Sequence, residues 1–326
     1  MKGTSDVLLL CMYVDDIVYM SSSGEMLAEF KSAMLSTFEM SDLGLLNYFL
    51  GLEVKQQKGS IFISQRRYAE GLLKKYGMLH CKSISNPMNT NEKLRRDDGS
   101  GIANAQRYRS MIGGLLYLSH TRPDLTYVVG VVSRFMQSPT MHHLGAVKRI
   151  FHYVSGTMGH GLLYECVSNP KLTGFTDSDW SGSSDDRKST TGWVFTMGSA
   201  AVSWCSKKQD IIALSSTEAE YVSATSAACQ GVWMRRVLGD MNQAQISPTV
   251  IYCDNRSAIS IAKNPILHGR TKHIETRFHF IRGLVNDGLI ELIHCRTEEQ
   301  AADVFTKPLS TQKHEDFRGV LGVRSF

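Results

Sequence analysis

The pattern of apolar residues changes at residues 168–170, a Ser-Asn-Pro turn, and this change constrains the fold more than any other feature. Before the turn, short apolar runs typical of strands are mixed with helical repeats and a polar connector over residues 81–104. After the turn, predicted strands come first, and helices and strands then alternate, which is the order of a mixed sheet flanked by helices. The sequence therefore predicts an α+β or α/β chain in two parts.

Length and composition set wide limits on the function. The 326 residues, 42% of them hydrophobic and 21% charged, are enough for two globular domains. The net charge of +5 permits a polyanionic partner without requiring one. The seven cysteines contain no CxxC pair, which favours buried free thiols over a disulfide framework or a zinc site.

The N-terminal apolar run resembles a signal peptide, but Asp15 and Asp16 interrupt it. No apolar run reaches the roughly 18 residues that a membrane span requires. We therefore expect an intracellular protein that is not secreted and has no membrane partner.

Four acidic residues of the second part stand where ligands commonly gather. Asp177 and Asp254 end predicted strands, and Glu220 lies in the first turn of a helix that begins with the capping-box pattern Ser215–Glu218. Asp303 lies in the first turns of the last predicted helix. Such positions can converge at one edge of a sheet, where four carboxylates would repel one another unless a cation such as Mg²⁺ neutralised them. For each acid alone, a helix cap or a solvated turn is the simpler explanation.

The stretches around these acids resemble the ribonuclease H domain of copia-type LTR retrotransposons. The matching stretches are Gly174–Trp180, Leu214–Tyr221, Tyr252–Asn255, Thr271–Phe280 and Ala302–Lys307. The resemblance implies four metal-binding and catalytic acids, namely Asp177, Glu220, Asp254 and Asp303. Glu218 is the competing candidate for the second acid, and Glu220 is preferred because Ala-Glu-Tyr matches the core of the family's motif.

The resemblance also implies a reaction, the endonucleolytic cleavage of the RNA strand of RNA–DNA hybrids by two Mg²⁺ ions, for which Mn²⁺ can substitute. Because such enzymes recognise 2′-hydroxyls and the shape of the hybrid, we expect little base specificity. His273 is assigned to catalysis by analogy with ribonucleases H that use a mobile histidine, and a structural role is an equal alternative. The alternative function is a non-catalytic nucleic-acid-binding fragment of a decayed or co-opted element.

The first part of the chain contains a second acidic signal, Asp15 and Asp16, between two apolar runs. Two adjacent carboxylates there need either a metal ion or an exposed turn. Residues 10–164 resemble the C-terminal half of the palm and the thumb of copia-type reverse transcriptases, which implies a metal-binding role for the two acids. The matching stretches are Tyr13–Ile17, Tyr48–Glu53, Ile63–Gln65, Leu72–Met78, Tyr108–Tyr117, Thr121–Asp124 and Ser133–Met136.

The family's polymerases need a third catalytic aspartate and fingers, which would precede Asp15. We therefore expect the C-terminal piece of a Pol polyprotein, with the remainder of Pol as a partner and without primer extension by this chain alone. Candidate phosphate contacts on the thumb-like surface are Lys74, Lys75, Lys148 and Arg149, for which a solvated helix face is an equal alternative.

The expected organisation has four segments. Residues 1–80 are the C-terminal part of the palm, and residues 81–167 are a connector and a helical thumb-like region. Residues 168–310 form the ribonuclease H domain, and residues 311–326 form a C-terminal tail. As the product of a mobile element, the chain is expected in cytoplasmic particles or in the nucleus.

Overall fold

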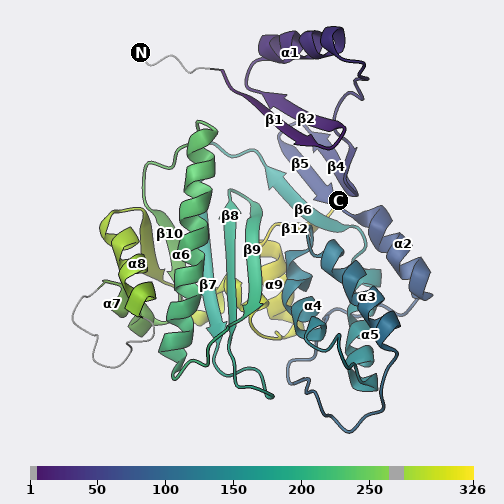
Figure 1. The fold of residues 1–326 in the computed structure, drawn as a ribbon, viewed down its shortest axis with the longest axis vertical. Coiled ribbons are helices and arrows are strands. Elements are labelled where there is room, and N and C mark those ends of the chain that lie inside the picture. The colour runs from purple at the N-terminus through teal and green to yellow at the C-terminus, as the bar shows by residue number, and fades with distance from the viewer. Residues whose placement is uncertain (1–5, 264–274) are drawn as a thin grey trace.

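The structure is a computed structural model that describes residues 6–263 and 275–326 (Figure 1). Its described residues form a two-stranded hairpin, a five-stranded antiparallel sheet and a five-stranded mixed sheet. Helices pack beside all three sheets. The mixture of helices and strands agrees with the predicted fold class.

The N-terminal hairpin consists of β1 (Leu8–Tyr13) and β2 (Asp16–Ser21), and α1 (Gly24–Thr37) follows it. Ser23 caps α1 by accepting a hydrogen bond from the Met26 amide. No residue of α1 is buried, and Met12 in β1 keeps 75% of its surface exposed. The hairpin and α1 are therefore present, but in the described part of the chain they bury little apolar surface.

The antiparallel sheet joins segments that are far apart in the sequence. Its strands, in the order β12-β6-β5-β4-β3, are β12 (Val323–Ser325), β6 (His160–Glu165), β5 (Ser60–Ser64), β4 (Leu52–Gln57) and β3 (Tyr48–Phe49). The segment expected as a C-terminal tail forms α9 (Thr311–Val320) and β12. Leu321 and Val323 are buried against Leu162 of β6, and this burial anchors the end of the chain.

The helical region has its own apolar core. It comprises α2 (Arg66–Tyr76), α3 (Ala105–Leu118), α4 (Thr126–Ser133) and α5 (Met141–Gly156). Gly77 ends α2 in the left-handed conformation, with φ of 70°. The side chains of Leu73, Tyr108 and Phe151 are completely buried in this core, which gathers residues from all four helices. Helices α3, α4 and α5 lie within residues 81–167, where a helical region was expected.

A buried ion pair crosslinks this helical region. Arg122 precedes the 3-10 turn η1 (Pro123–Leu125), and its Nε and Nη2 donate to the two carboxylate oxygens of Asp124 at 2.9 and 2.7 Å. The Tyr153 hydroxyl donates to the same carboxylate at 2.8 Å, and Arg318 of α9 donates to the Tyr153 hydroxyl at 3.0 Å. The network therefore ties α9 to α5 and η1.

Acid is expected to weaken the fold through His160, which lies near this network. Burial, with further contributions from Arg122 and Arg318, lowers the pKa of His160 from 6.5 to about 4. The folded protein holds the imidazole ring of His160 in its neutral form. The stabilisation of the fold by His160 is therefore fully present above pH 6.5 and is lost as the pH falls towards 4. Urea denaturation at several pH values should show this loss, and His160→Gln should make the decline shallower. Equal declines in the two proteins would exclude His160 as a cause.

The mixed sheet lies between two apolar layers (Figure 1). Its strand order is β11-β10-β7-β8-β9, with β7 (Leu172–Asp179), β8 (Thr190–Met197), β9 (Ala200–Lys208), β10 (Thr249–Cys253) and β11 (Ile290–His294). One face packs against α6 (Ser216–Asp240), α7 (Arg256–Lys263) and α8 (Glu275–Asn286). Phe195 points to this layer, whereas its neighbour Val194 points to the layer that contains α9. The predicted mixed sheet with flanking helices is confirmed.

The prediction of a regular helix from Thr297 onwards is wrong. Two 3-10 turns, η3 (Thr297–Glu299) and η4 (Ala301–Phe305), stand there instead. Gln300 separates them with an extended ψ of 91°, because its side chain donates to the Thr176 carbonyl at 2.9 Å and accepts from the Ala302 amide at 3.2 Å. Strand β7 also continues through Asp179 rather than ending at Asp177, because it stays paired with β8.

In the described part of the chain, no helix combines the length and the apolar character that crossing a membrane requires.

Candidate metal centre

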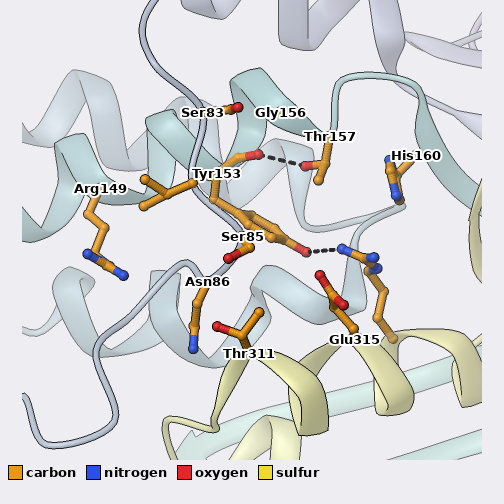
Figure 2. Close-up of a pocket in the computed structure, with 12 residues that line it drawn as sticks. Ser83, Ser85, Asn86, Arg149, Tyr153, Gly156, Thr157, His160, Thr311 and Glu315 are labelled. Carbon is orange, nitrogen blue, oxygen red and sulfur yellow. Dashed lines mark hydrogen bonds between the residues drawn. The ribbon is translucent and has the colours of Figure 1, made fainter.

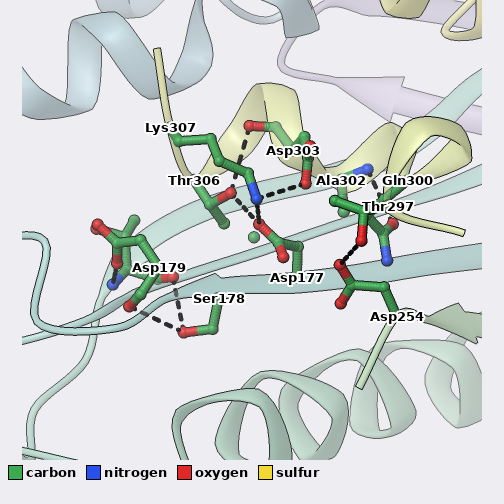
Figure 3. Close-up of polar contacts among 12 residues, drawn as sticks. Asp177, Ser178, Asp179, Asp254, Thr297, Gln300, Ala302, Asp303, Thr306 and Lys307 are labelled. Atoms are coloured by element: carbon green, nitrogen blue, oxygen red, sulfur yellow. Dashed lines mark hydrogen bonds and ion pairs between the residues drawn. The ribbon is translucent and has the colours of Figure 1, made fainter. Parts of the chain in front are cut away.

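The topology of the mixed sheet brings four acids to one edge, and Figure 3 shows three of them, Asp177, Asp254 and Asp303. Strands β7, β10 and β11 are parallel, so their carboxyl ends lie on the same side. Asp177 lies near the end of β7, and Asp254 directly follows β10. Asp303 lies in η4 after β11, and Glu220 lies near the start of α6. The structure thus gathers the four acids that the sequence singled out.

Glu220 and Asp254 form one side of this acid cluster. Ligand atoms of Glu220, Cys253 and Asp254 all lie within 4.8 Å of one another. The Ser178 amide donates to Glu220 Oε1 at 3.2 Å, whereas Oε2 is buried and has no hydrogen-bond partner among the described residues. Burial, followed by the charges of Asp177 and Asp254, holds the pKa of Glu220 well above its usual range. A cation beside this carboxylate would relieve both the repulsion and the missing hydrogen bond.

Asp177 and Asp303 form the other side, and cationic side chains surround them (Figure 3). Lys307 Nζ lies 2.8 Å from Asp303 Oδ1 and 3.5 Å from Asp177 Oδ2, and Lys313 Nζ lies 2.6 Å from Asp303 Oδ2. The Thr306 hydroxyl donates to Asp177 Oδ2. Burial and the charge of Asp177 raise the pKa of Asp303, although Lys307 and Lys313 oppose that shift. Burial lowers the pKa of Lys307, but Asp177 and Asp303 outweigh it, so the net shift is upward.

Gly192 allows η4, which carries Asp303, to approach the strand that carries Asp177. It lies opposite Asp177 in the β7–β8 pair. A Cβ at this position would lie 2.5 Å from Thr306 Cγ2 and 2.9 Å from Phe305 Cβ, so only glycine lets η4 pack directly on β8. This close packing brings Asp303 to the edge where Asp177 lies.

Glu218 forms hydrogen bonds that cap the start of α6. Its amide donates to Ser215 Oγ at 3.2 Å, and its Oε2 accepts from the Leu214 amide at 2.9 Å. Glu220, by contrast, belongs to the group of potential ligands with Cys253 and Asp254. The geometry therefore favours Glu220 over Glu218 as the metal ligand from this helix.

Several side chains at the site were not predicted from the sequence. Cys253 was interpreted only as a buried free thiol, yet it borders the acid cluster. Burial, with Glu220 nearby, raises the pKa of its thiol, so it stays protonated at neutral pH and is a poor ligand for a hard cation. Thr306 and Lys307 lie within the Ala302–Lys307 stretch and could have been noticed there, whereas nothing in the sequence pointed to Lys313.

Two other predicted site features lie away from this cluster or cannot be placed. Asp15 lies in the exposed turn between β1 and β2, and Asp16 is the exposed first residue of β2. Among the described residues they do not belong to any group of three acids, histidines or cysteines that could hold an ion. His273 lies outside the described residues.

The four basic residues predicted to contact phosphates have different surroundings. Lys74 pairs with Glu70 at 2.6 Å, Lys75 donates to Ser110 Oγ at 3.2 Å, and Lys148 is exposed. Arg149 instead lines a cavity of about 650 Å³ between α5 and α9 (Figure 2). Their contact with nucleic acid stays a prediction.

A second cavity of about 250 Å³ adjoins the acid cluster, since Thr306 and Lys307 help to line it. Lys93, Arg134 and Lys208 add positive charge to its wall. Asp179 also faces this cavity, and burial raises the pKa of its carboxyl to about 6. The acids that could hold a metal ion are thus next to side chains suited to a phosphate backbone.

Comparisons with known proteins place the chain in a family. Residues 1–90 match the family described as reverse transcriptase (RNA-dependent DNA polymerase). The chain is 38% identical over 322 residues to the retrovirus-related Pol polyprotein from transposon RE1 of Arabidopsis thaliana, which covers 99% of this chain and 22% of that protein. It is 30% identical over 233 residues to a transposon Ty5-1 protein of Saccharomyces cerevisiae, which covers 70% of this chain and 76% of that protein.

The chain belongs to the copia-type retrovirus-related Pol polyproteins of transposons. The family predicted from the motifs is confirmed. This copia-type Pol chain spans about a fifth of the length of the RE1 polyprotein that it matches.

A solved structure supports the fold of the copia-type Pol chain. The foamy viral protease-reverse transcriptase dRH, solved in complex with double-stranded DNA, aligns with a TM-score of 0.54 and 15% identity. The alignment covers 88% of this chain and 46% of that one. The copia-type Pol chain therefore shares the fold of that protein over most of its length, and its residues 1–90 match the reverse transcriptase family.

Proposed function

We propose that the second part of this chain cleaves the RNA strand of RNA–DNA hybrids endonucleolytically, as the ribonuclease H of a copia-type Pol polyprotein. The observation that carries the proposal is the gathering of Asp177, Glu220, Asp254 and Asp303 at one sheet edge, where no described residue donates a hydrogen bond to the buried Glu220 Oε2. The protein would act in cytoplasmic particles or in the nucleus. Its partners would be the RNA–DNA hybrid and the remainder of Pol.

The donor set fits Mg²⁺, with Mn²⁺ as a substitute. The four carboxylates offer hard oxygen ligands, and the protonated Cys253 thiol does not compete as a soft one. Asp177, Glu220, Asp254 and Asp303 would hold the ions. Bound divalent ions would supply a neutralising charge and Lewis acidity at the scissile phosphate.

Neighbouring groups hold the acids in position for this chemistry. The Ser178 amide orients Glu220, and the Thr297 hydroxyl donates to Asp254 Oδ2 at 3.2 Å. Thr306 orients Asp177 from the opposite side. Because these contacts fix the carboxylates before substrate binds, little reorganisation is needed during the reaction.

A labelled RNA–DNA hybrid incubated with purified protein and Mg²⁺ tests the proposal. We expect cuts in the RNA strand alone and complete loss of cleavage in EDTA, because the acids cannot act on phosphate without a cation. Double-stranded DNA of the same sequence is the matched control and should stay intact. Folded protein that binds the hybrid without cutting it would contradict the proposal.

That result would favour the second candidate, a non-catalytic nucleic-acid-binding fragment. The observation behind it is the cationic wall of the cavity beside the acids, to which Arg134 and Lys208 contribute. Such binding would weaken steeply with salt, because contacts with phosphate release counterions.

A further inference from the structure

The two sides of the acid cluster are neutralised differently. Glu220 and Asp254 form no ion pair within 4 Å in the described ranges, and Glu220 Oε2 has no hydrogen-bond partner there. The other side is already supplied with cations, since Lys307 contacts both Asp177 and Asp303 and Lys313 contacts Asp303. In the part of the chain that the structure describes, two ammonium groups therefore contact the Asp177–Asp303 side, and none lies within 4 Å of Glu220 or Asp254.

Lys307 stands between the two carboxylates that it contacts (Figure 3). Because like charges repel strongly at short range, its ammonium and a divalent ion cannot share Asp303 and Asp177 without a large penalty. An ion that binds these two acids must therefore displace the ammonium. No such exchange is needed at Glu220 and Asp254.

The position of Lys307 also allows it to withdraw. Its side chain is 37% exposed, and its four-carbon stem is flexible. It lines the cavity beside the acid cluster, together with Arg134 and Lys208. A substrate phosphate entering that cavity would give the released ammonium a new anionic partner.

We propose that Lys307 is a tethered cation that occupies the Asp177–Asp303 side of the cluster in the metal-free protein and competes there with a divalent ion. The protein then binds one ion readily at Glu220 and Asp254, and a second ion only when Lys307 leaves. Lys313 strengthens this competition by holding the second carboxylate oxygen of Asp303. The inference rests on the proposed nuclease function, because it concerns the metal ions of that site.

Calorimetric titration of the full chain with Mn²⁺ tests the exchange without any measurement of cleavage. The parent protein should show a tight first step and a weaker second step. Lys307→Gln should tighten the second step by about 10-fold, a typical coupling between two binding events, and should leave the first step nearly unchanged. Lys307→Arg keeps the charge and should retain the weak second step.

Two further variants complete the test. Lys31→Gln removes another ion-paired lysine, the partner of Asp42 after α1, and should change neither step. Lys313→Gln removes one partner of Asp303 and should tighten the second step less than Lys307→Gln does, by about 5-fold, the low end of such couplings. It also replaces Lys307→Gln if that variant does not fold in chelator, as judged by circular dichroism.

Equal second steps in the parent, Lys307→Gln and Lys313→Gln would overturn the inference, as would equal tightening by Lys307→Gln and Lys307→Arg. If the titrations give the expected result but the protein does not cleave the hybrid, only the nuclease proposal is overturned. Absence of Mn²⁺ binding in every protein would overturn both.

Discussion

Replacing Asp254 by Asn is expected to reduce cleavage of an RNA–DNA hybrid by about 10²–10³-fold, the usual cost of removing one preorganised electrostatic group from an active site. Asp254 lies at the end of β10 beside Glu220, and its Oδ2 already accepts from the Thr297 hydroxyl. The amide of Asn keeps the shape but removes the charge that would hold a divalent ion. The measurement is the initial rate of RNA-strand cleavage in saturating Mg²⁺.

The same substitution should leave the fold intact. Asp254 is only partly buried, and removing one of several neighbouring negative charges relieves repulsion, so we expect the free energy of unfolding to change by less than about 1 kcal/mol. Asp287→Asn, an exposed acid distant from the cluster in sequence, is the matched control and should keep full activity. Cleavage by Asp254→Asn at the parental rate would remove Asp254 from the site.

The largest loss of stability is expected from Asp124→Asn. Asp124 and Arg122 are each 1% exposed, and the carboxylate accepts two hydrogen bonds from Arg122 and one from Tyr153. Removing its charge leaves the guanidinium buried without a counter-ion, which typically costs about 3–5 kcal/mol. Urea denaturation in metal-free buffer measures the change in the free energy of unfolding.

A double variant separates the lost charge from lost packing. Arg122→Met combined with Asp124→Asn removes the uncompensated cation, so part of the stability should return. Tyr153→Phe removes the two hydrogen bonds that the hydroxyl makes with Asp124 and Arg318 but leaves the ion pair in place, and it should cost only about 2 kcal/mol. If Asp124→Asn destabilises no more than Tyr153→Phe, the ion pair does not hold the helical region together.

Local patterns were enough to predict most of the regular elements. Met26, Phe30 and Met34 recur at helical spacing and lie in α1, and Gly77 ends α2 in the left-handed conformation that glycine favours. Gly198, also with positive φ, forms the turn between β8 and β9. These features depend on neighbouring residues, so they can be recognised without knowledge of the tertiary structure.

Features that depend on distant contacts escaped prediction. Gln300 breaks the last predicted helix because its side chain reaches Thr176, 124 positions away. Lys313 enters the acid cluster from α9, and no local pattern connects it with Asp303. The acids themselves were found because their stretches match a family, whereas Cys253 was overlooked because a thiol is not the ligand that Mg²⁺ prefers.

The pairing of β12 with β6 has a consequence for how such elements can exchange sequence. Strand β12 belongs to the C-terminal end of the chain, yet Val323 and Leu321 pack against Leu162, which precedes the turn at residues 168–170. Recombination at that turn would combine β6 of one element with β12 of another. The contacting surfaces of these two strands would have diverged independently. Hybrid elements with this breakpoint should therefore be disfavoured, so the two halves of the chain are expected to share one line of descent.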